Sequence, residues 1–268
     1  MQIAVLITTY NRVNTTLKCL ESLYKSQLKN STFEVYLVDG GSTDETVLRV
    51  RQEFSNCNVS VVEGLYWNRG ILEAWKKSIE STKRYDAFLW LNDDVHLNIS
   101  ALQEVVNTLE KTDGRCIVVG YTKASGTDEI TYGALKRRGK SKINFQTTAD
   151  NSDQIVTMNG NCVLISKTTQ ELIGLLNPRF QHSFGDIDYG LRATEAGIGI
   201  VSTTEAVAAL DRHFSPYSTN TNYTFAQVID LMRDPKGIPF RELLYFTKRH
   251  AGTLWPLHFV LRYLKMLW

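Results

Sequence analysis

The 268-residue chain contains few cysteines, and no two of them are spaced as a metal-binding pair. Its four cysteines lie far apart, in or beside predicted regular elements: Cys19, Cys57, Cys116 and Cys162. Cysteine-based metal sites need closely paired ligands, so this pattern excludes them and predicts reduced structural thiols.

The chain also lacks an excess of charge of either sign. It has 30 basic and 28 acidic residues, which give a net charge of +2. Nucleic-acid-binding proteins usually carry a clear basic excess, so nucleic acid is not an expected partner. A hydrophobic content of 43% and a charged content of 22% suit one large α/β catalytic domain with a sizeable core, and exclude disorder.

We also expect no leader peptide, internal repeat or membrane-spanning run. The N-terminus enters an apolar run at once, without a basic region or a cleavage site, so we expect a cytoplasmic protein. The apolar stretch at residues 254–268 is shorter than the roughly 20 residues that span a bilayer. It is typical of an interfacial helix or a dimer contact.

The most informative feature present is an apolar run that ends in two carboxylates. Residues 88–91 lead into Asn92, Asp93 and Asp94. Such a strand end fixes hard oxygen ligands on a rigid element, which suits a divalent cation that bridges nucleotide phosphates. Helix capping or turn formation is the alternative interpretation of paired carboxylates.

Two strand–loop–helix units precede this segment. An apolar run at residues 3–7 leads into the polar residues 8–12, and a second run at residues 33–38 leads into Asp39 and a glycine-containing loop. Ligands of open α/β sheets bind at the carboxyl ends of the strands. We therefore expect both loops to face one crevice.

Together, five ordered motifs resemble those of the family 2 glycosyltransferases, which use a nucleotide sugar as donor. The motifs are Thr8-Thr9-Tyr10-Asn11-Arg12, Asp39-Gly40-Gly41-Ser42-Thr43-Asp44, Asn68-Arg69-Gly70, Asn92-Asp93-Asp94 and Gly185-Asp186-Ile187-Asp188. Their order is more specific than any single motif, and the closest likeness is to bacterial polysaccharide enzymes, including rhamnosyltransferases. Two departures are the sequence Asn-Asp-Asp in place of Asp-x-Asp, and Gly185 before Asp186 where many relatives have Glu-Asp.

The resemblance implies a fold and a division of the chain. The fold is α/β, the A-type glycosyltransferase fold, with a Rossmann-like mixed central sheet flanked by helices and a C-terminal helical extension. Residues 1–220 are the expected catalytic domain, with a nucleotide-binding half at 1–95 and an acceptor half at 96–220. Residues 221–268 are the expected extension, which associates with a membrane or a second subunit.

The resemblance also implies the role of each site residue. Asp186 is the expected catalytic base and Asp188 a supporting residue, although carboxylates in a first helical turn also act as caps. Asp94 and His213 are the expected ligands of Mn²⁺ or Mg²⁺, while a structural role is the alternative for His213. The expected nucleotide-binding residues are Thr8, Thr9, Tyr10, Arg12, Asp39, Arg69 and Asp93, and the expected sugar and acceptor pocket is formed by Asn159, Gly160 and Asn161. Solvation of Arg69 and a bulge at Gly160 remain the alternatives.

These roles describe an inverting transfer from a UDP- or dTDP-sugar to a hydroxyl of a glycan or lipid-linked glycan acceptor in bacterial surface polysaccharide synthesis. A carboxylate deprotonates the hydroxyl, and a metal ion stabilises the leaving diphosphate. A sugar nucleotidyltransferase is one alternative, but residues 8–12 lack a glycine-rich phosphate loop. A non-catalytic nucleotide-sugar-binding or membrane scaffold is another, and the presence of both Asp94 and Asp186 argues against it. The Gln-x-x-Arg-Trp signature of processive synthases is missing, which favours one transfer per encounter.

Two further segments carry excess basic charge. Residues 123–153, with a basic centre at 136–142, are predicted to form a poorly ordered solvated loop, with a mobile lid as the alternative. Residues 240–268 combine apolar side chains with Arg241, Lys248, Arg249, Arg262 and Lys265, which predicts an anchor at the inner face of the cytoplasmic membrane. Packing of this segment against the catalytic domain or in a homodimer is the alternative.

Overall fold

A seven-stranded mixed sheet forms the centre of the molecule. The computed structural model describes residues 1–112, 114–212 and 222–267. The strand order is β12-β5-β11-β4-β1-β2-β3. In chain order, the bounds are β1 (Gln2–Thr9), β2 (Thr32–Asp39), β3 (Cys57–Val61), β4 (Ala87–Leu91), β5 (Cys116–Val119), β11 (Cys162–Ser166) and β12 (Gly199–Ser202). Strand β11 runs antiparallel to both of its neighbours, and the other neighbouring pairs are parallel.

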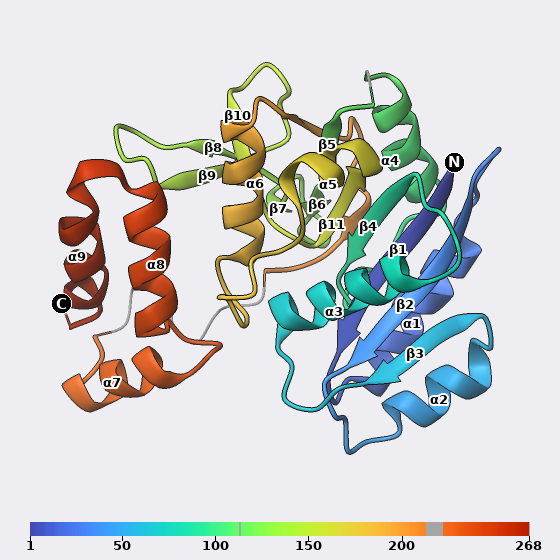
Figure 1. Cartoon of the computed structure of the whole chain (residues 1–268), viewed down its shortest axis with the longest axis horizontal. Coiled ribbons are helices and arrows are strands. Elements are labelled where there is room, and N and C mark those ends of the chain that lie inside the picture. The colour runs from blue at the N-terminus through green and yellow to red at the C-terminus, as the bar shows by residue number, and fades with distance from the viewer. Residues whose placement is uncertain (113, 213–221, 268) are drawn as a thin grey trace.

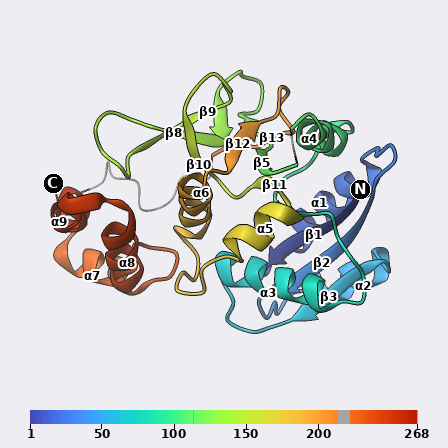
Figure 2. The ribbon, with the colours of Figure 1, turned by 45° about the horizontal axis from the view of Figure 1, so that its top comes forward.

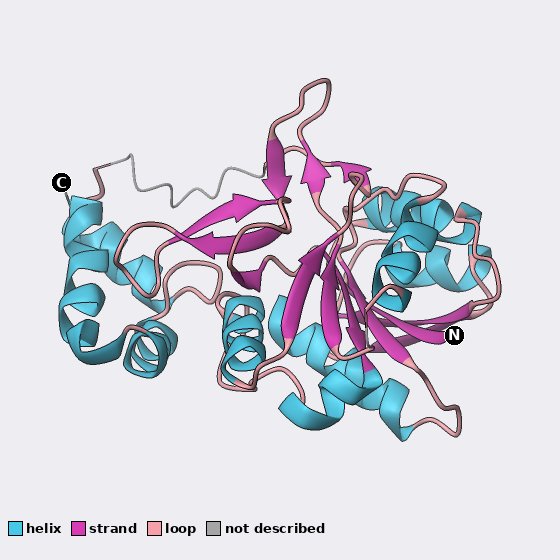
Figure 3. Ribbon diagram, turned by 90° about the horizontal axis from the view of Figure 1, so that it is seen from above, coloured by secondary structure: helices cyan, strands magenta, loops and turns pink. Residues whose placement is uncertain are grey.

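Helices cover both faces of this sheet, as Figures 1 and 3 show. One face packs against α1 (Val13–Lys25), α2 (Thr46–Glu53) and α4 (Ala101–Glu110), and the other against α3 (Trp67–Glu80), α5 (Lys167–Ile173) and α6 (Gly185–Glu195). Burial on both faces explains why β1 and β4 are almost continuous apolar runs. The predicted mixed sheet flanked by helices is confirmed.

The basic segment that follows β5 forms strands, so the prediction of a poorly ordered loop at residues 123–153 is wrong. One small sheet has the order β10-β8-β9 and another the order β13-β6-β7. Their bounds are β6 (Thr122–Lys123), β7 (Ile130–Tyr132), β8 (Ala134–Arg137), β9 (Phe145–Thr148), β10 (Ile155–Met158) and β13 (Ala208–Ala209). Ala134 and Leu135 are buried, and Lys136 pairs with Asp153 at 2.9 Å, so buried apolar and paired charged side chains hold β8 in place.

The C-terminal segment forms a group of helices beside α6 (Figures 1 and 2). It consists of α7 (Phe225–Arg233), α8 (Phe240–His250), the short 3₁₀ turn η1 (Gly252–Leu254) and α9 (Trp255–Leu267). A core of its own joins α7, α8 and α9, and Phe246 of α8 also stacks on Phe184 with ring centroids 4.9 Å apart. None of the described helices is long and apolar enough to cross a membrane. The division of the chain at residue 220 stays a prediction.

Candidate active site

The loops that follow β1 and β2 are joined to each other at the carboxyl edge of the sheet. Thr9 and Asp39 lie opposite each other at the ends of the two parallel strands. Asn11, in a left-handed conformation with φ of 51°, donates its N–H to Ser42 Oγ at 2.7 Å and accepts from the N–H of Thr43 at 2.8 Å. The two loops therefore meet at one edge, as their sequences predict.

Asp39 shapes its own loop. The side chain is completely buried, and one carboxylate oxygen accepts hydrogen bonds from the N–H groups of Gly41 and Ser42 at 2.9 and 2.6 Å. The other oxygen accepts from Ser42 Oγ at 2.5 Å. An aspartate that bonds to the backbone after it is a common turn former. Its predicted contact with the nucleotide stays a prediction.

The remaining predicted residues of the first motif lie around the end of β1. Thr8 is half-buried, and the buried hydroxyl of Thr9 is bonded to that of Thr16 at 2.7 Å. Tyr10 is 50% exposed. Half of the Tyr10 side chain is therefore accessible to a ligand at the end of β1.

Arg12 lies between the two carboxylates that follow β4. Its Nη1 is 2.9 Å from Asp93 Oδ1 and 3.2 Å from Asp94 Oδ2. Burial raises the pKa of the Asp93 carboxyl, whereas the Arg12 charge opposes that rise. The guanidinium thus supplies positive charge to a partly desolvated acidic pair.

The carboxylate pair fits a divalent cation. The second oxygen of Asp93 is buried and has no hydrogen-bond partner within the described part of the chain. Mg²⁺ and similar hard cations are often held by one or two carboxylates together with substrate phosphates. Across residues 1–112, 114–212 and 222–267, no group of three or more His, Cys, Asp or Glu side chains is placed so that it could hold a metal ion. His213, the other predicted ligand, lies outside the described residues.

Asn92 and Trp67 connect this pair to the predicted sugar and acceptor segment. Trp67 Nε1 donates to Asn92 Oδ1 at 2.6 Å, and the N–H of Asn92 donates to the carbonyl of Asn161 at 2.9 Å. A Cβ on Gly160 would lie 2.5 Å from the Trp67 ring, so only glycine allows this approach. Asn159 does not join these contacts. Its N–H donates to the carbonyl of Gly133, just before β8 of the small sheet, at 2.9 Å.

Asp186 lies against the same turn. One carboxylate oxygen accepts from the N–H of Gly160 at 3.0 Å, and the other accepts from the N–H of Ile187 at 2.8 Å. The second bond satisfies an amide in the first turn of α6, so the residue also has the capping role that its position suggested. Burial raises the pKa of the Asp186 carboxyl, which makes it a stronger proton acceptor than an exposed aspartate.

Asp188 is completely buried, and both of its carboxylate oxygens have partners. Its Oδ2 accepts from Arg192 Nε at 2.9 Å, and its Oδ1 lies 2.9 Å from Nε2 of His250 in α8. These contacts hold α6 in place, and the supporting role in the site stays a prediction. The sequence contained no signal for His250, because 62 residues separate it from Asp188.

In the Asn68-Arg69-Gly70 motif, the packing contacts are made by Asn68 rather than by Arg69. Arg69 is exposed, whereas Asn68 is buried and donates to the carbonyls of Phe180 and Asn177 at 2.7 and 3.0 Å. A Cβ on Gly185 would lie 1.7 Å from Asn68 Oδ1, so glycine permits the closest approach of α3 to α6. The motif thereby fixes the start of α3 against the start of α6.

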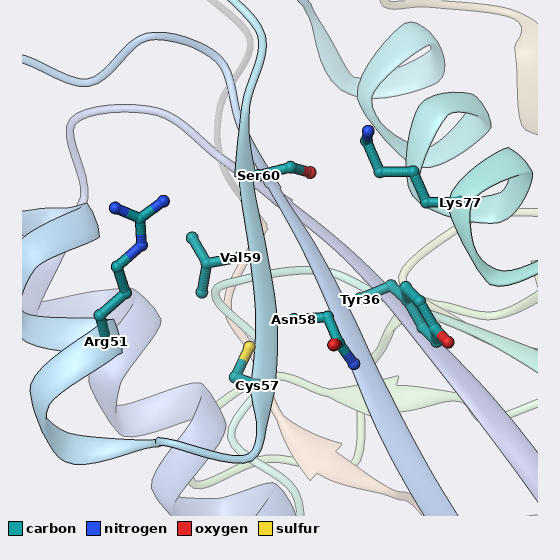
Figure 4. Close-up of a pocket in the computed structure, with 7 residues that line it drawn as sticks. All are labelled: Tyr36, Arg51, Cys57, Asn58, Val59, Ser60 and Lys77. Atoms are coloured by element: carbon teal, nitrogen blue, oxygen red, sulfur yellow. The ribbon is translucent and has the colours of Figure 1, made fainter. Parts of the chain in front are cut away.

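A separate hollow lies on the edge strand β3 (Figure 4). Arg51 of α2 and Lys77 of α3 stand on opposite sides of that strand, and the hollow is lined by these two residues with Tyr36, Cys57, Asn58, Val59 and Ser60. None of the described candidate residues above lines it. The carboxyl edge between β1, β2 and β4 is therefore the candidate site.

Comparison with known proteins agrees with this geometry. The family model described as Glycosyl transferase family 2 matches residues 4–168. The curated protein Glycosyltransferase AglE of Haloferax volcanii is 26% identical over 212 residues, which cover 76% of this chain and 65% of that protein.

Solved structures share the fold at lower identity. S. aureus TarS residues 1–349 in complex with UDP-GlcNAc has a TM-score of 0.59 at 16% identity, covering 87% of this chain and 67% of that one. Mannosyltransferase PcManGT from Pyrobaculum calidifontis, in complex with GDP-Man and Mn²⁺, has a TM-score of 0.55 at 15% identity, covering 91% and 61%. The likeness establishes the A-type fold, and the chain spans only about two thirds of these proteins.

We predict that Gly160→Ala damages the site. The added methyl group would press on Trp67 and Asp186, and overpacking of this kind costs about 1–3 kcal/mol. We expect donor turnover to fall by about tenfold or more, because displacement of catalytic groups by about 1 Å is costly. Gly199→Ala is the matched control, since a Cβ there meets no atom within 4 Å. Equal turnover in both variants would contradict the contact.

We also predict that Arg12→Gln tightens binding of Mn²⁺ to the donor-free protein. Removal of the guanidinium leaves the Asp93–Asp94 pair without its counter-charge, so we expect an affinity gain of about tenfold, or roughly 1.4 kcal/mol. Isothermal titration calorimetry with MnCl₂ alone measures it, with Arg51→Gln on the β3 hollow as the control. Unchanged or weaker binding would show that Arg12 does not compete for the carboxylates.

Proposed function

This chain belongs to glycosyl transferase family 2, and on that premise we propose that it is an inverting glycosyltransferase. It would transfer a sugar from a nucleotide-sugar donor to an acceptor hydroxyl. The observation that carries the proposal is the meeting of the Asp93–Asp94 pair, the Gly160 turn and Asp186 through Trp67 and Asn92. The proposed metal ligands, Asp93 and Asp94, and the proposed base, Asp186, whose pKa is raised, thus belong to one network of contacts.

The donor is proposed to be a UDP- or dTDP-sugar. TarS in complex with UDP-GlcNAc supports a nucleotide-sugar donor in this fold. Thr8, Thr9, Tyr10 and Asp39 lie at or just after the carboxyl ends of β1 and β2, where such a donor would bind. Arg69 lies in the first turn of α3, where the neighbouring Gly70 approaches Thr8. Exposed Tyr10 and Arg69 would contact the nucleotide, whereas Asp39 would act by holding the shape of its loop.

Asp93 and Asp94 would hold Mn²⁺ or Mg²⁺. The PcManGT complex with GDP-Man and Mn²⁺ supports a metal in this fold. When bound, the ion would offset the negative charge that develops on the leaving diphosphate. This chemistry removes the need for a protein acid, which agrees with one candidate base rather than an acid and base pair.

Asp186 is proposed to take the proton of the acceptor hydroxyl. Its carboxylate already accepts two amide hydrogen bonds that fix its orientation, and further lone pairs remain for an acceptor. Direct attack by that hydroxyl would invert the anomeric carbon. The acceptor would be a glycan or a lipid-linked glycan of surface polysaccharide synthesis. A scaffold without catalysis would not need a base of raised pKa here.

We predict that Asp186→Asn lowers turnover by about 10² to 10⁴ while donor affinity changes little. Asparagine keeps the shape but cannot take a proton, and its single amide oxygen can accept only one of the two backbone N–H bonds that Asp186 accepts. Because the lost bond opposes the relief of burying a charged carboxylate, we expect the melting temperature at pH 7 to change little. Release of nucleoside diphosphate and calorimetric donor binding are the measurements.

The pH profile provides the control for this variant. The wild-type rate should fall as the pH drops through the raised pKa of Asp186, because the base must be deprotonated. Asp128→Asn, on an exposed loop, should keep that profile. Normal turnover of Asp186→Asn would overturn the assignment, and loss of folding would favour capping as its main role.

Metal removal is the next test. We predict that excess EDTA and Asp94→Ala each abolish transfer without unfolding, because the diphosphate loses its counter-charge while the apolar core is untouched. Asp93→Ala should be milder. Turnover with and without re-added MnCl₂, together with circular dichroism, measures both effects. Full activity in excess chelator would exclude a metal-dependent reaction.

A further inference from the structure

Helix α9 has one face buried in the protein and one face exposed. Tyr263 and Met266 are buried against α7 and α8, and the Tyr263 hydroxyl donates to the carbonyl of Ile238 at 2.9 Å. The opposite face carries apolar side chains at positions i, i+3, i+4 and i+7, which form one stripe on a helix. The stripe consists of Leu257, Val260, Leu261 and Leu264, which are 37–53% exposed, and Leu254 continues it at 60%.

The charged side chains in the same stretch of the chain as this apolar stripe are all basic. Residues 243–268 contain no aspartate or glutamate. Lys265 is exposed at one edge of the stripe, Arg262 is exposed farther around the helix, and the Lys248 ammonium is 4.9 Å from the ring centre of Trp255. Arg249 is excluded from this set because it pairs with Glu195 of α6.

The turn between β8 and β9 adds more basic charge beside the stripe. Figures 1 and 3 both show this hairpin reaching toward the C-terminal helices. Lys142 lies against η1, since a Cβ on Gly252 would be 3.2 Å from its Nζ. Arg138, Lys140 and Lys142 are all exposed. The segment predicted to be a solvated loop is thus held next to η1, at the start of α9.

We propose that the stripe of α9 and the tip of this hairpin form one docking face for an anionic membrane surface. Apolar side chains on one face of a helix, with basic side chains beside them, allow a helix to lie in the interface of an anionic bilayer. Basic residues near such a surface gain attraction to acidic headgroups. The bilayer is favoured over a second copy of the chain, because a symmetric dimer would bring the same basic groups together.

This face is connected to the candidate active site. Phe246 and His250 of α8 contact Phe184 and Asp188, which flank Asp186. Helix α8 in turn packs on α9 through the core of the C-terminal helices. Resting on the proposed function, the inference places the base at a fixed distance from a surface that presents lipid-linked acceptors.

The test is co-flotation of the full chain with phosphatidylcholine vesicles, with and without phosphatidylglycerol. Wild type should float only with the anionic vesicles. The double variant Leu257→Ser/Leu261→Ser should lose affinity by about tenfold or more, since it removes two of the five exposed aliphatic side chains that would enter the bilayer. Lys140→Gln/Lys142→Gln should lose about tenfold and show a weaker dependence on salt. Leu48→Ser and Lys18→Gln, exposed on α2 and α1, are matched controls that should float like wild type.

Three outcomes would overturn the proposal. They are a wild type that does not float with anionic vesicles, double variants that both float like wild type, and a leucine variant that instead converts a dimer to a monomer in sedimentation. All variants alter exposed side chains, and unchanged circular dichroism verifies their folding. Release of nucleoside diphosphate with a soluble acceptor should be the same in all of them. Because Asp186→Asn should still float, failure of docking is distinguishable from failure of the proposed catalysis.

Discussion

The burial of acidic side chains at the carboxyl edge of the sheet is the constraint on which the site depends. A charged carboxylate that loses water must be compensated by donors or by positive charge. Asp39 is compensated by its own loop, and Asp188 by Arg192 and His250. Asp93 and Asp186 are compensated less completely, and burial raises the pKa of both. The residues proposed for chemistry are therefore those whose charge the fold leaves partly unbalanced.

This constraint explains why distant segments converge on one place. The Asp93 carboxylate needs Arg12 from the loop after β1, and Asp186 needs the N–H of Gly160 from the turn before β11. The Trp67 ring fills the space between these groups and is fixed by Asn92. A displacement of any one group would leave a buried polar atom without its partner, so the network is expected to move as a unit.

The sequence predicted the parts of the structure that rest on local patterns. Apolar runs that end in polar residues located β1, β2 and β4, and the motif order placed Asp93, Asp94 and Asp186 at one edge. The hairpin of β8 and β9 was not predicted, because most of its residues are charged or polar and only a short pair, Ala134 and Leu135, is apolar and buried. The roles of Trp67 and His250 depend on contacts across 25 and 62 residues, which no local pattern encodes.

The C-terminal helices show why an amphipathic pattern alone leaves its partner open. Both α8 and α9 have apolar and basic residues, and from sequence alone the same two partners, a membrane or another part of the protein, stay open for each helix. The structure separates the helices: α8 directs Phe246 and His250 inward to the helix that carries Asp186, whereas α9 keeps four aliphatic side chains exposed. Because α8 is bonded to the site and α9 is packed on α8, a partner bound to α9 would hold the whole catalytic edge in one orientation. Recognition of the acceptor would then depend on the position of the partner that binds α9 as well as on the shape of the acceptor pocket.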